Sequence, residues 1–146
     1  MSKAGAAVLS GLVGLLLVPV LGAETPTGYK VVVNSANTVS TLSRDSLSRI
    51  FLKKTTTWPN GQTAAPVDQA TNAPSRRAFS KAILGRAPYE VAAYWNQMIF
   101  SGRGLPPPTK ASDSEVLAFV RNNVNAIGYV AGDAKLGEGV KVVTVQ

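Results

Sequence analysis

The sequence contains no cysteine and no histidine. The chain therefore has no thiol nucleophile, lacks the commonest zinc ligands and has no side chain that ordinarily titrates near neutral pH. Most classes of enzyme are excluded on this ground, although a serine and lysine dyad or a pair of carboxylates stays open. Because the acidic residues are scattered singly along the chain, we expect no catalysis, no metal site and no cofactor.

Aromatic residues make up only 7% of the chain and do not alternate with Lys and Arg. Surfaces that bind nucleic acid commonly interleave the two types, so we expect no nucleic-acid partner.

Acidic residues are also few, with 8 against 15 basic ones and a formal net charge of +7. This balance favours an anionic ligand or surface. An ordinary basic surface without a ligand remains the alternative.

Long apolar runs are confined to the amino terminus. Lys3 precedes the run AAVLSGLVGLLLV, and small residues follow up to Ala23. This order is typical of a secretory signal peptide, residues 1–23, that is cleaved near Ala23. A retained membrane anchor is the alternative. We expect export to the periplasm and a single domain over 24–146 that folds without disulfides.

Apolar patterns predict strands that alternate with helices. The run YKVVVNS is continuous and β-branched, as in a strand that is covered on both faces. Ser112 and Glu115 have the spacing of a capping box at the start of a helix. Further strands are predicted at 64–67, 126–130 and 140–145, and further helices after Ser43, over 74–84 with Gly85 at its end, and from Pro88. The alternation is typical of an α/β layered domain.

A polar loop, predicted over 68–75, connects one of these strands to the helix over 74–84. Ligands of α/β sheets bind at loops beyond the carboxyl ends of strands, and the first N–H groups of a helix lack internal partners. We therefore predict an oxyanion site here. Arg76 is predicted to supply charge, because it lies nearer the helix start and the apolar face than Arg77 does. The alternative is a pair of ordinary solvated arginines.

Four stretches, in this order, resemble a known family: LSRDSLSRIFLKKTTTWPNGQTAAPVDQ, SRRAF, YWNQMIFSGRG and AIGYV. They are similar to the phosphate-binding proteins of bacterial high-affinity phosphate transporters, and more closely to short, single-lobe proteins of the phosphate transporter substrate-binding kind. The resemblance runs from about Tyr29 to Val145. It implies one α/β lobe of the type 2 periplasmic binding fold, with a mixed sheet flanked by helices.

The resemblance also implies which residues meet the ligand. The family's segment V-x-R-x-D-G-S-G-T-x-x-x-F aligns between Val67 and Phe79. Gln69 then stands at the arginine position, Ser75 keeps the chemistry of the threonine, and Pro74 removes a backbone N–H. The predicted ligand-binding residues are Gln69, Thr71, Asn72, Ser75, Arg76 and Arg77.

The function implied is that of an exported phosphate-binding or oxyanion-binding module, or an accessory module, related to the substrate-binding component of phosphate ABC transporters. The expected partners are inorganic phosphate or a similar oxyanion, a transporter or a second lobe, and another copy of the chain. The alternative is a basic interaction module that docks on a protein or an anionic envelope surface without a specific ligand. A specific site should prefer one oxyanion, whereas a diffuse basic surface should follow charge and salt.

Overall fold

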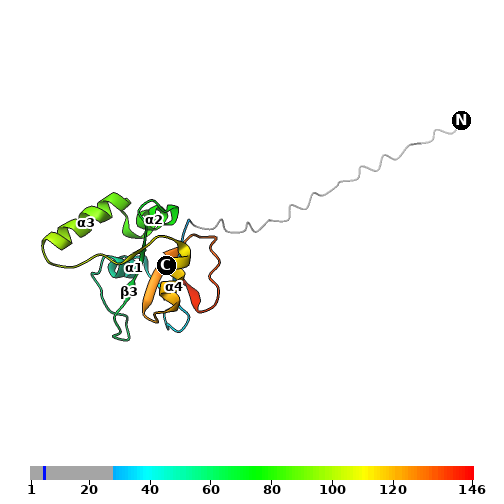
Figure 1. Cartoon of the computed structure of the whole chain (residues 1–146). Helices are drawn as coiled ribbons and strands as arrows, with labels where there is room; N and C mark the ends of the chain where they lie inside the picture. The colour runs from blue at the N-terminus through cyan, green and yellow to red at the C-terminus, as the bar shows by residue number, and fades with distance from the viewer. Residues whose placement is uncertain (1–4, 6–27) are drawn as a thin grey trace.

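The computed structural model describes Gly5 and residues 28–146, which are drawn in colour in Figure 1. The predicted signal peptide, residues 1–23, lies outside the described residues apart from Gly5. In chain order the elements are β1 (Lys30–Asn34), β2 (Thr41–Leu42), α1 (Arg44–Phe51), β3 (Ala65–Pro66), β4 (Asp68–Gln69), α2 (Pro74–Phe79), the π-helix η1 (Ser80–Leu84), α3 (Pro88–Phe100), β5 (Thr109–Lys110), α4 (Asp113–Arg121), β6 (Ala126–Val130) and β7 (Val140–Val145). Within this described part of the chain, no helix has the length and apolar character needed to cross a bilayer.

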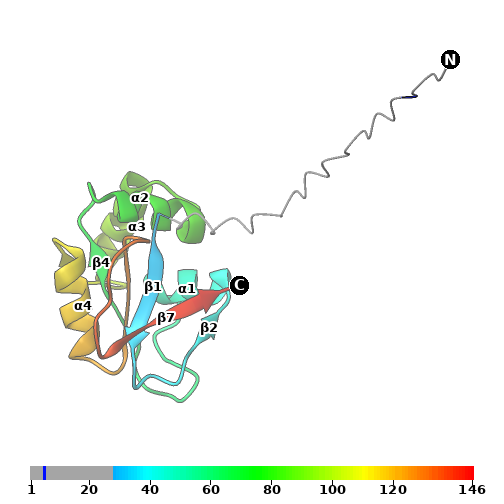
Figure 2. The same ribbon diagram turned by 90° about the vertical axis from the view of Figure 1, so that its right-hand side faces the viewer.

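Five strands form one mixed sheet in the order β2-β7-β1-β6-β3. The central strand β1 runs antiparallel to both of its neighbours, with Val32 opposite Gly128 of β6 and Val142 of β7. The outer strands β2 and β3 run parallel to β7 and β6, and Figure 2 shows β2 and β7 at one edge. The predicted α/β class, with a mixed sheet flanked by helices, is confirmed.

The valine run of β1 is continuous because both faces of this strand are covered. Val31 and Val33 belong to a core with α1, the α2–η1 stretch and the first half of α3. Val32 belongs to a second core on the opposite face, together with residues of α4. Successive residues of a strand point to opposite faces, so a strand buried on both sides needs apolar residues throughout. The prediction of a doubly covered strand is confirmed.

Two helix starts follow the predicted capping residues. Ser43 caps α1 by accepting a hydrogen bond from the Ser46 amide. Ser112 caps α4 in the same way, by accepting from the Glu115 amide. The Glu115 carboxylate accepts from the Ala111 amide at 2.7 Å, one residue before the partner in a standard capping box. These local signals therefore place both helix starts correctly.

The helix predicted over 74–84 is present, but its winding changes along its length. Pro74 is its first residue, and Gly85 ends it with a left-handed φ of 64° that glycine adopts without steric cost. The last five residues, η1, are π-helical. The wider turn brings the Gly85 amide to the Ser80 carbonyl. No sequence signal predicted this change.

A second ladder, which joins β4 and β5 in parallel, has no counterpart in the sequence prediction. The strand predicted at 64–67 is shorter, because only β3 pairs with β6, and after Val67 the chain pairs with β5 instead. The segment predicted as a loop over 68–75 therefore begins as a strand and ends as a helix. Residues 70–73 remain as the connection, which we call the 70–73 loop.

Candidate functional site

A buried ion pair lies where β4 passes α2. The Arg76 guanidinium and the Asp68 carboxylate are 2.8 Å apart (Nη1 to Oδ1), and each side chain is 9% exposed. Arg76 Nη1 also donates to the Gln69 carbonyl at 2.8 Å. Arg76 Nε is buried and has no hydrogen-bond partner among the described residues. The positive charge predicted to meet an anion is thus balanced inside the protein by Asp68.

The Tyr129 hydroxyl completes this arrangement by donating to Asp68 Oδ1. The same oxygen accepts from the Gln69 amide at 2.9 Å. Tyr129 lies on β6, and its ring stacks on Phe79 of α2 with the ring centres 4.0 Å apart, which fixes the position of the hydroxyl. We call Asp68, Gln69, Arg76 and Tyr129 the polar corner.

Burial sets the protonation of the polar corner. Burial raises the pKa of the Asp68 carboxyl, and the Arg76 charge and the Tyr129 hydroxyl oppose this rise. Burial also raises the pKa of the Tyr129 hydroxyl, and the negative charge of Asp68 adds to the increase. Tyr129 therefore keeps its proton and acts as the donor to Asp68.

Gln69 connects the polar corner to the start of α4. Its Nε2 donates to Asp113 Oδ1 and to the Tyr129 carbonyl, both at 2.8 Å. Asp113 lies in the first turn of α4 and also accepts from the Ala131 amide at 3.3 Å. Gln69, which stands at the family's arginine position, thus uses both hydrogens of its side-chain amide in hydrogen bonds within the protein. It also lies beside a carboxylate, which repels anions.

Three predicted ligand residues, Gln69, Ser75 and Arg76, are buried. The structure brings Gln69 and Arg76 together through the hydrogen bond described above. Ser75 lies in the first turn of α2 and is 4% exposed. Gln69 and Arg76 therefore support the 70–73 loop through their hydrogen bonds, and Ser75 lies beside the loop at the helix start.

The other three, Thr71, Asn72 and Arg77, are exposed at the 70–73 loop and the adjoining helix. Arg77 Nη1 donates to the Asn72 carbonyl at 3.2 Å, so the guanidinium lies against the loop. Thr71 belongs to the loop itself. Arg77 is the cation that the structure places at the surface of the predicted site.

The start of α2 lacks the side-chain cap that α1 and α4 have. Its N-cap residue, Ala73, offers only a methyl group, and no side chain caps the helix. The Ala73 amide donates to the Ala70 carbonyl at 3.0 Å, which closes the 70–73 loop. In the described part of the chain, the Ser75 and Arg76 amides have no hydrogen-bond partner. These amides and the positive end of the helix dipole therefore suit an anionic acceptor.

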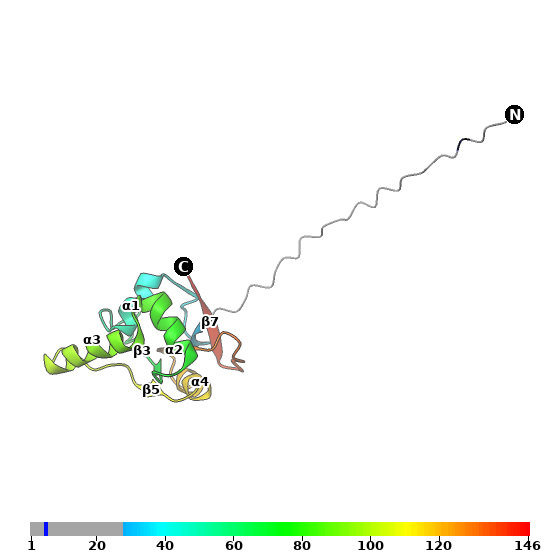
Figure 3. The same ribbon diagram turned by 90° about the horizontal axis from the view of Figure 1, so that it is seen from above.

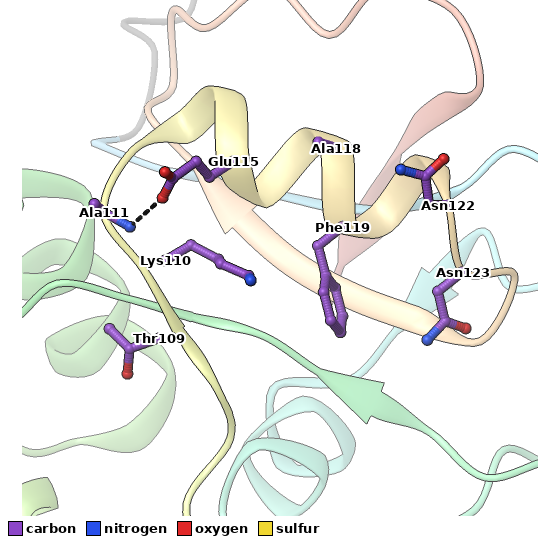
Figure 4. Close-up of a pocket in the computed structure, with 8 residues that line it drawn as sticks. All are labelled: Thr109, Lys110, Ala111, Glu115, Ala118, Phe119, Asn122 and Asn123. Carbon is purple, nitrogen blue, oxygen red and sulfur yellow. Dashed lines mark hydrogen bonds between the residues drawn. The ribbon is translucent and has the colours of Figure 1, made fainter.

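A separate groove of about 710 Å³ lies between β5 and α4 (Figure 4). Lys110 Nζ lies 5.6 Å from the centre of the Phe119 ring, within the range of a cation–π contact. The Glu115 carboxylate, which also lines the groove, accepts from the Ala111 amide. Both charged side chains that line the groove thus have partners within the protein, so it is a weaker candidate than the 70–73 loop.

The sequence prediction missed Asp68, Tyr129 and Asp113. Asp68 and Tyr129 are 61 positions apart, and Gln69 and Asp113 are 44 positions apart. The acidic residues look scattered in the sequence because their partners are distant. One local signal was available. Asp68 directly follows the apolar end of a strand pattern, and a carboxylate buried at such a position is costly unless it has a partner.

No protein-family model and no curated protein matches the sequence. Solved structures do match. An ABC-type phosphate transport receptor from Vibrio cholerae has a TM-score of 0.60 and 22% identity over 81% of this chain. A Clostridium perfringens protein, assigned as a phosphate ABC transporter substrate-binding protein and containing bound phosphate, has a TM-score of 0.64 and 19% identity over 81% of the chain. PstS from Borrelia burgdorferi has a TM-score of 0.61 and 11% identity over 82% of the chain.

The chain has a phosphate-binding-protein-like fold. The resemblance stated from the sequence is confirmed at the level of the fold, and the Vibrio and Clostridium neighbours are described as a phosphate transport receptor and a transporter substrate-binding protein. This chain spans less than half of each of them, with 46%, 44% and 47% of their lengths covered. At such low identity the likeness shows the phosphate-binding-protein-like fold alone.

Proposed function

We propose that this chain is an exported module that binds phosphate or a similar oxyanion, related to the substrate-binding component of phosphate ABC transporters, and that it acts without chemistry. The observation that supports this most is the fold, because 81% of the chain matches a transport protein with phosphate bound. A transporter, a second lobe or another copy of the chain is the proposed partner. In this proposal, the processed protein begins at or near Glu24.

The proposed anion site is the 70–73 loop together with the first turn of α2. The Ser75 and Arg76 amides and the side chains of Thr71, Asn72 and Ser75 are its proposed hydrogen-bonding groups. Arg77 supplies the charge, because its guanidinium already lies against the loop at the Asn72 carbonyl. A guanidinium that meets an oxyanion forms charge-assisted hydrogen bonds, which are stronger than neutral ones.

The side chains of Arg76 and Gln69 support this site from below. Arg76 pairs with Asp68, and Gln69 donates to Asp113 and to the Tyr129 carbonyl. These contacts fix the two ends of the 70–73 loop. The Arg76 charge is already balanced, and the loop is open to solvent, which screens an anion. We therefore propose weak binding, with a dissociation constant on the order of 0.1 mM or weaker.

Calorimetric titration with phosphate, sulfate and a neutral sugar, at low salt and at about 0.15 M salt, tests the proposal. The sample is the chain over 24–146, which includes every residue of both cores. We expect one of the two anions to bind more tightly than the other, and no binding of the sugar. The same heats for phosphate and sulfate at every salt concentration, or no heat with either, would contradict a specific site.

Arg77→Gln and Lys53→Gln form a matched pair of variants for this titration. Lys53 is a basic residue that directly follows the C-cap of α1, far along the chain from the loop. Arg77→Gln should weaken anion binding by about tenfold, the scale of one lost hydrogen bond to a charged group. Lys53→Gln should change it by less than about twofold, as expected for a screened surface charge. Equal losses would favour a diffuse basic surface.

Mass spectrometry of the protein recovered from the periplasm tests the proposed export. A chain that begins at or near Glu24 supports it. Recovery of the uncleaved chain from membranes would show a retained anchor and would overturn this part of the proposal.

A further inference from the structure

Large apolar side chains lie on the surface at the free end of α3. Phe100 is 92% exposed, Leu105 is 67% exposed and Ile99 is 47% exposed. Arg103 lies among them in the sequence. We call Ile99, Phe100, Arg103 and Leu105 the α3 tip. Single exposed apolar residues are common, but a group of three at one protruding end indicates a surface that another molecule covers.

The α3 tip extends beyond the core. Val91 and Trp95 are the buried residues of α3, and the five residues that follow Trp95 include no fully buried one. Two views of the molecule, Figure 1 and Figure 3, both show the carboxyl end of α3 projecting from the body. The tip is therefore a convex protrusion rather than the wall of a pocket.

The segment after α3 folds back along the helix end and is stiff. Gly102 adopts a left-handed φ of 68°, and its amide donates to the Ile99 carbonyl at 3.0 Å. Gly104 returns beside Met98, where an added Cβ would lie 3.8 Å from Met98 Cε. The residue just before Leu105 is thus held next to the last turn of α3. Three prolines follow Leu105, and their fixed φ angles lower the entropy that this loop can lose on binding.

The chain segment that contains the α3 tip carries only basic charges. From Val91 to Ser112 the sequence has no Asp or Glu. Arg103 Nε donates to Ser101 Oγ at 2.9 Å, and no carboxylate pairs with Arg103 in the described part of the chain. Apolar side chains beside an unbalanced positive charge are complementary to a bilayer with anionic headgroups. The apolar groups can enter the boundary of the acyl chains while the arginine meets lipid phosphate.

A second copy of the chain fits the α3 tip less well. Two tips in contact would bring their Arg103 side chains together with no acidic residue on either tip segment. In the groove between β5 and α4, an incoming arginine would meet Lys110 as well as Glu115, and the Glu115 carboxylate already has a partner within the protein. Like charges in contact oppose association. A bilayer needs no matching cavity, because lipids rearrange around a convex protrusion.

We propose that the α3 tip inserts into the headgroup region of a bilayer that contains anionic lipid, and so holds this protein at a membrane surface. The inference is independent of the proposed anion site, because the α3 tip and the 70–73 loop share no residue.

Sedimentation with lipid vesicles tests this inference on the chain over 24–146. Vesicles of phosphatidylcholine alone are compared with vesicles in which roughly one third of the lipid is phosphatidylglycerol, at about 0.02 M and about 0.15 M salt. We expect at least tenfold stronger partitioning onto the anionic vesicles at the lower salt. Equal binding to both kinds of vesicle, or no binding to the anionic ones, would overturn the proposal.

Two matched double variants separate insertion of the tip from general attraction to charge. Phe100→Ser with Leu105→Ser removes the two most exposed apolar groups of the tip. Tyr89→Ser with Val124→Ser removes an aromatic and an aliphatic residue that are also exposed, at 74% and 52%, but lie elsewhere. The tip variant should lose about tenfold or more in partitioning, because it removes most of the buried apolar area. The control should lose less than about twofold.

Arg103→Gln should weaken partitioning by about fivefold, the effect of one basic residue near an anionic surface. If the tip variant binds as well as the unaltered chain, the whole basic surface is responsible and the tip has no role. If anionic vesicles do not bind the chain, and light scattering shows a dimer that the tip variant loses, a second copy is the occupant. Either result would overturn the proposal.

Discussion

At the polar corner, charged groups lie inside the protein, and at the α3 tip, apolar groups lie outside it. In the polar corner, Arg76 and Asp68 satisfy one another, with help from the Tyr129 hydroxyl. In the tip, Phe100 is almost fully exposed. Both regions depart from the usual distribution of residues, in opposite directions.

The difference shows how stability and binding are divided in this chain. A buried charge is compatible with the fold only while its partner is present, because removing the partner leaves a charge without compensation. An exposed apolar group contributes little to the fold, so it is free to contact another molecule. Substitutions should therefore change the free energy of unfolding strongly at the polar corner and weakly at the α3 tip.

Asp68→Asn should have the largest effect among substitutions of the polar corner, because it removes the charge that balances Arg76 in a buried site. We expect the free energy of unfolding to fall by about 3–5 kcal/mol, the usual result of breaking one side of a buried ion pair. Urea denaturation followed by circular dichroism measures this change.

Asp45→Asn is the matched control for Asp68→Asn. Asp45 pairs with Arg49 at the same distance, 2.8 Å, but on the surface of α1. An exposed pair of this kind contributes less than about 1 kcal/mol. Equal effects of the two substitutions would mean that the Asp68 carboxyl is uncharged in the native protein, and the description of the corner as an ion pair would be wrong.

Tyr129→Phe should have an intermediate effect. It removes a hydroxyl that donates to a carboxylate, at a cost of about 1.5–3 kcal/mol in the free energy of unfolding near neutral pH. The pH dependence gives a second measurement. The raised pKa means that the native state keeps this proton while the unfolded chain loses it near pH 10, the ordinary value for tyrosine.

The native protein should therefore lose stability as the pH rises through about 10, and part of this loss should be absent from Tyr129→Phe. Urea denaturation at several alkaline pH values gives the two slopes to compare. Tyr89→Phe, at an exposed position, is the control for removing a hydroxyl. A Tyr129→Phe chain with the same alkaline slope as the native sequence would show that this hydroxyl does not control the loss.

Most of the fold could be predicted because its signals are local. Ser43 and Ser112 mark their helix starts, Gly85 marks a helix end, and β6 and β7 coincide with the strands predicted at 126–130 and 140–145. The ladder of β4 and β5 could not be predicted in this way. Each of its strands has two residues, and the two lie about 40 positions apart in the sequence.

The polar corner shows the same limit more clearly. The sequence places Arg76 near the apolar face of its helix, and this residue is buried in the structure. No pattern near Arg76 in the sequence indicates that Tyr129 belongs to the same cluster. The two meet only in the folded sheet, where β6 lies beside β3 and Tyr129 of β6 therefore reaches the start of β4. The six predicted ligand residues share one short segment, so their proximity follows from the sequence. Their function as a site stays a prediction.

Phe100→Ser should have the smallest effect on stability. With a side chain that is 92% exposed, Phe100 has almost no packing to lose, so the free energy of unfolding should change by no more than about 0.5 kcal/mol. Phe79→Ala, which truncates a fully buried ring that stacks on Tyr129, should instead cost about 3–5 kcal/mol. Urea denaturation of both variants measures the two losses in the free energy of unfolding, so the exposed and the buried phenylalanine can be compared directly. A loss of more than about 1 kcal/mol in Phe100→Ser would mean that the α3 tip packs within the molecule, and the proposed membrane contact would then compete with the fold itself.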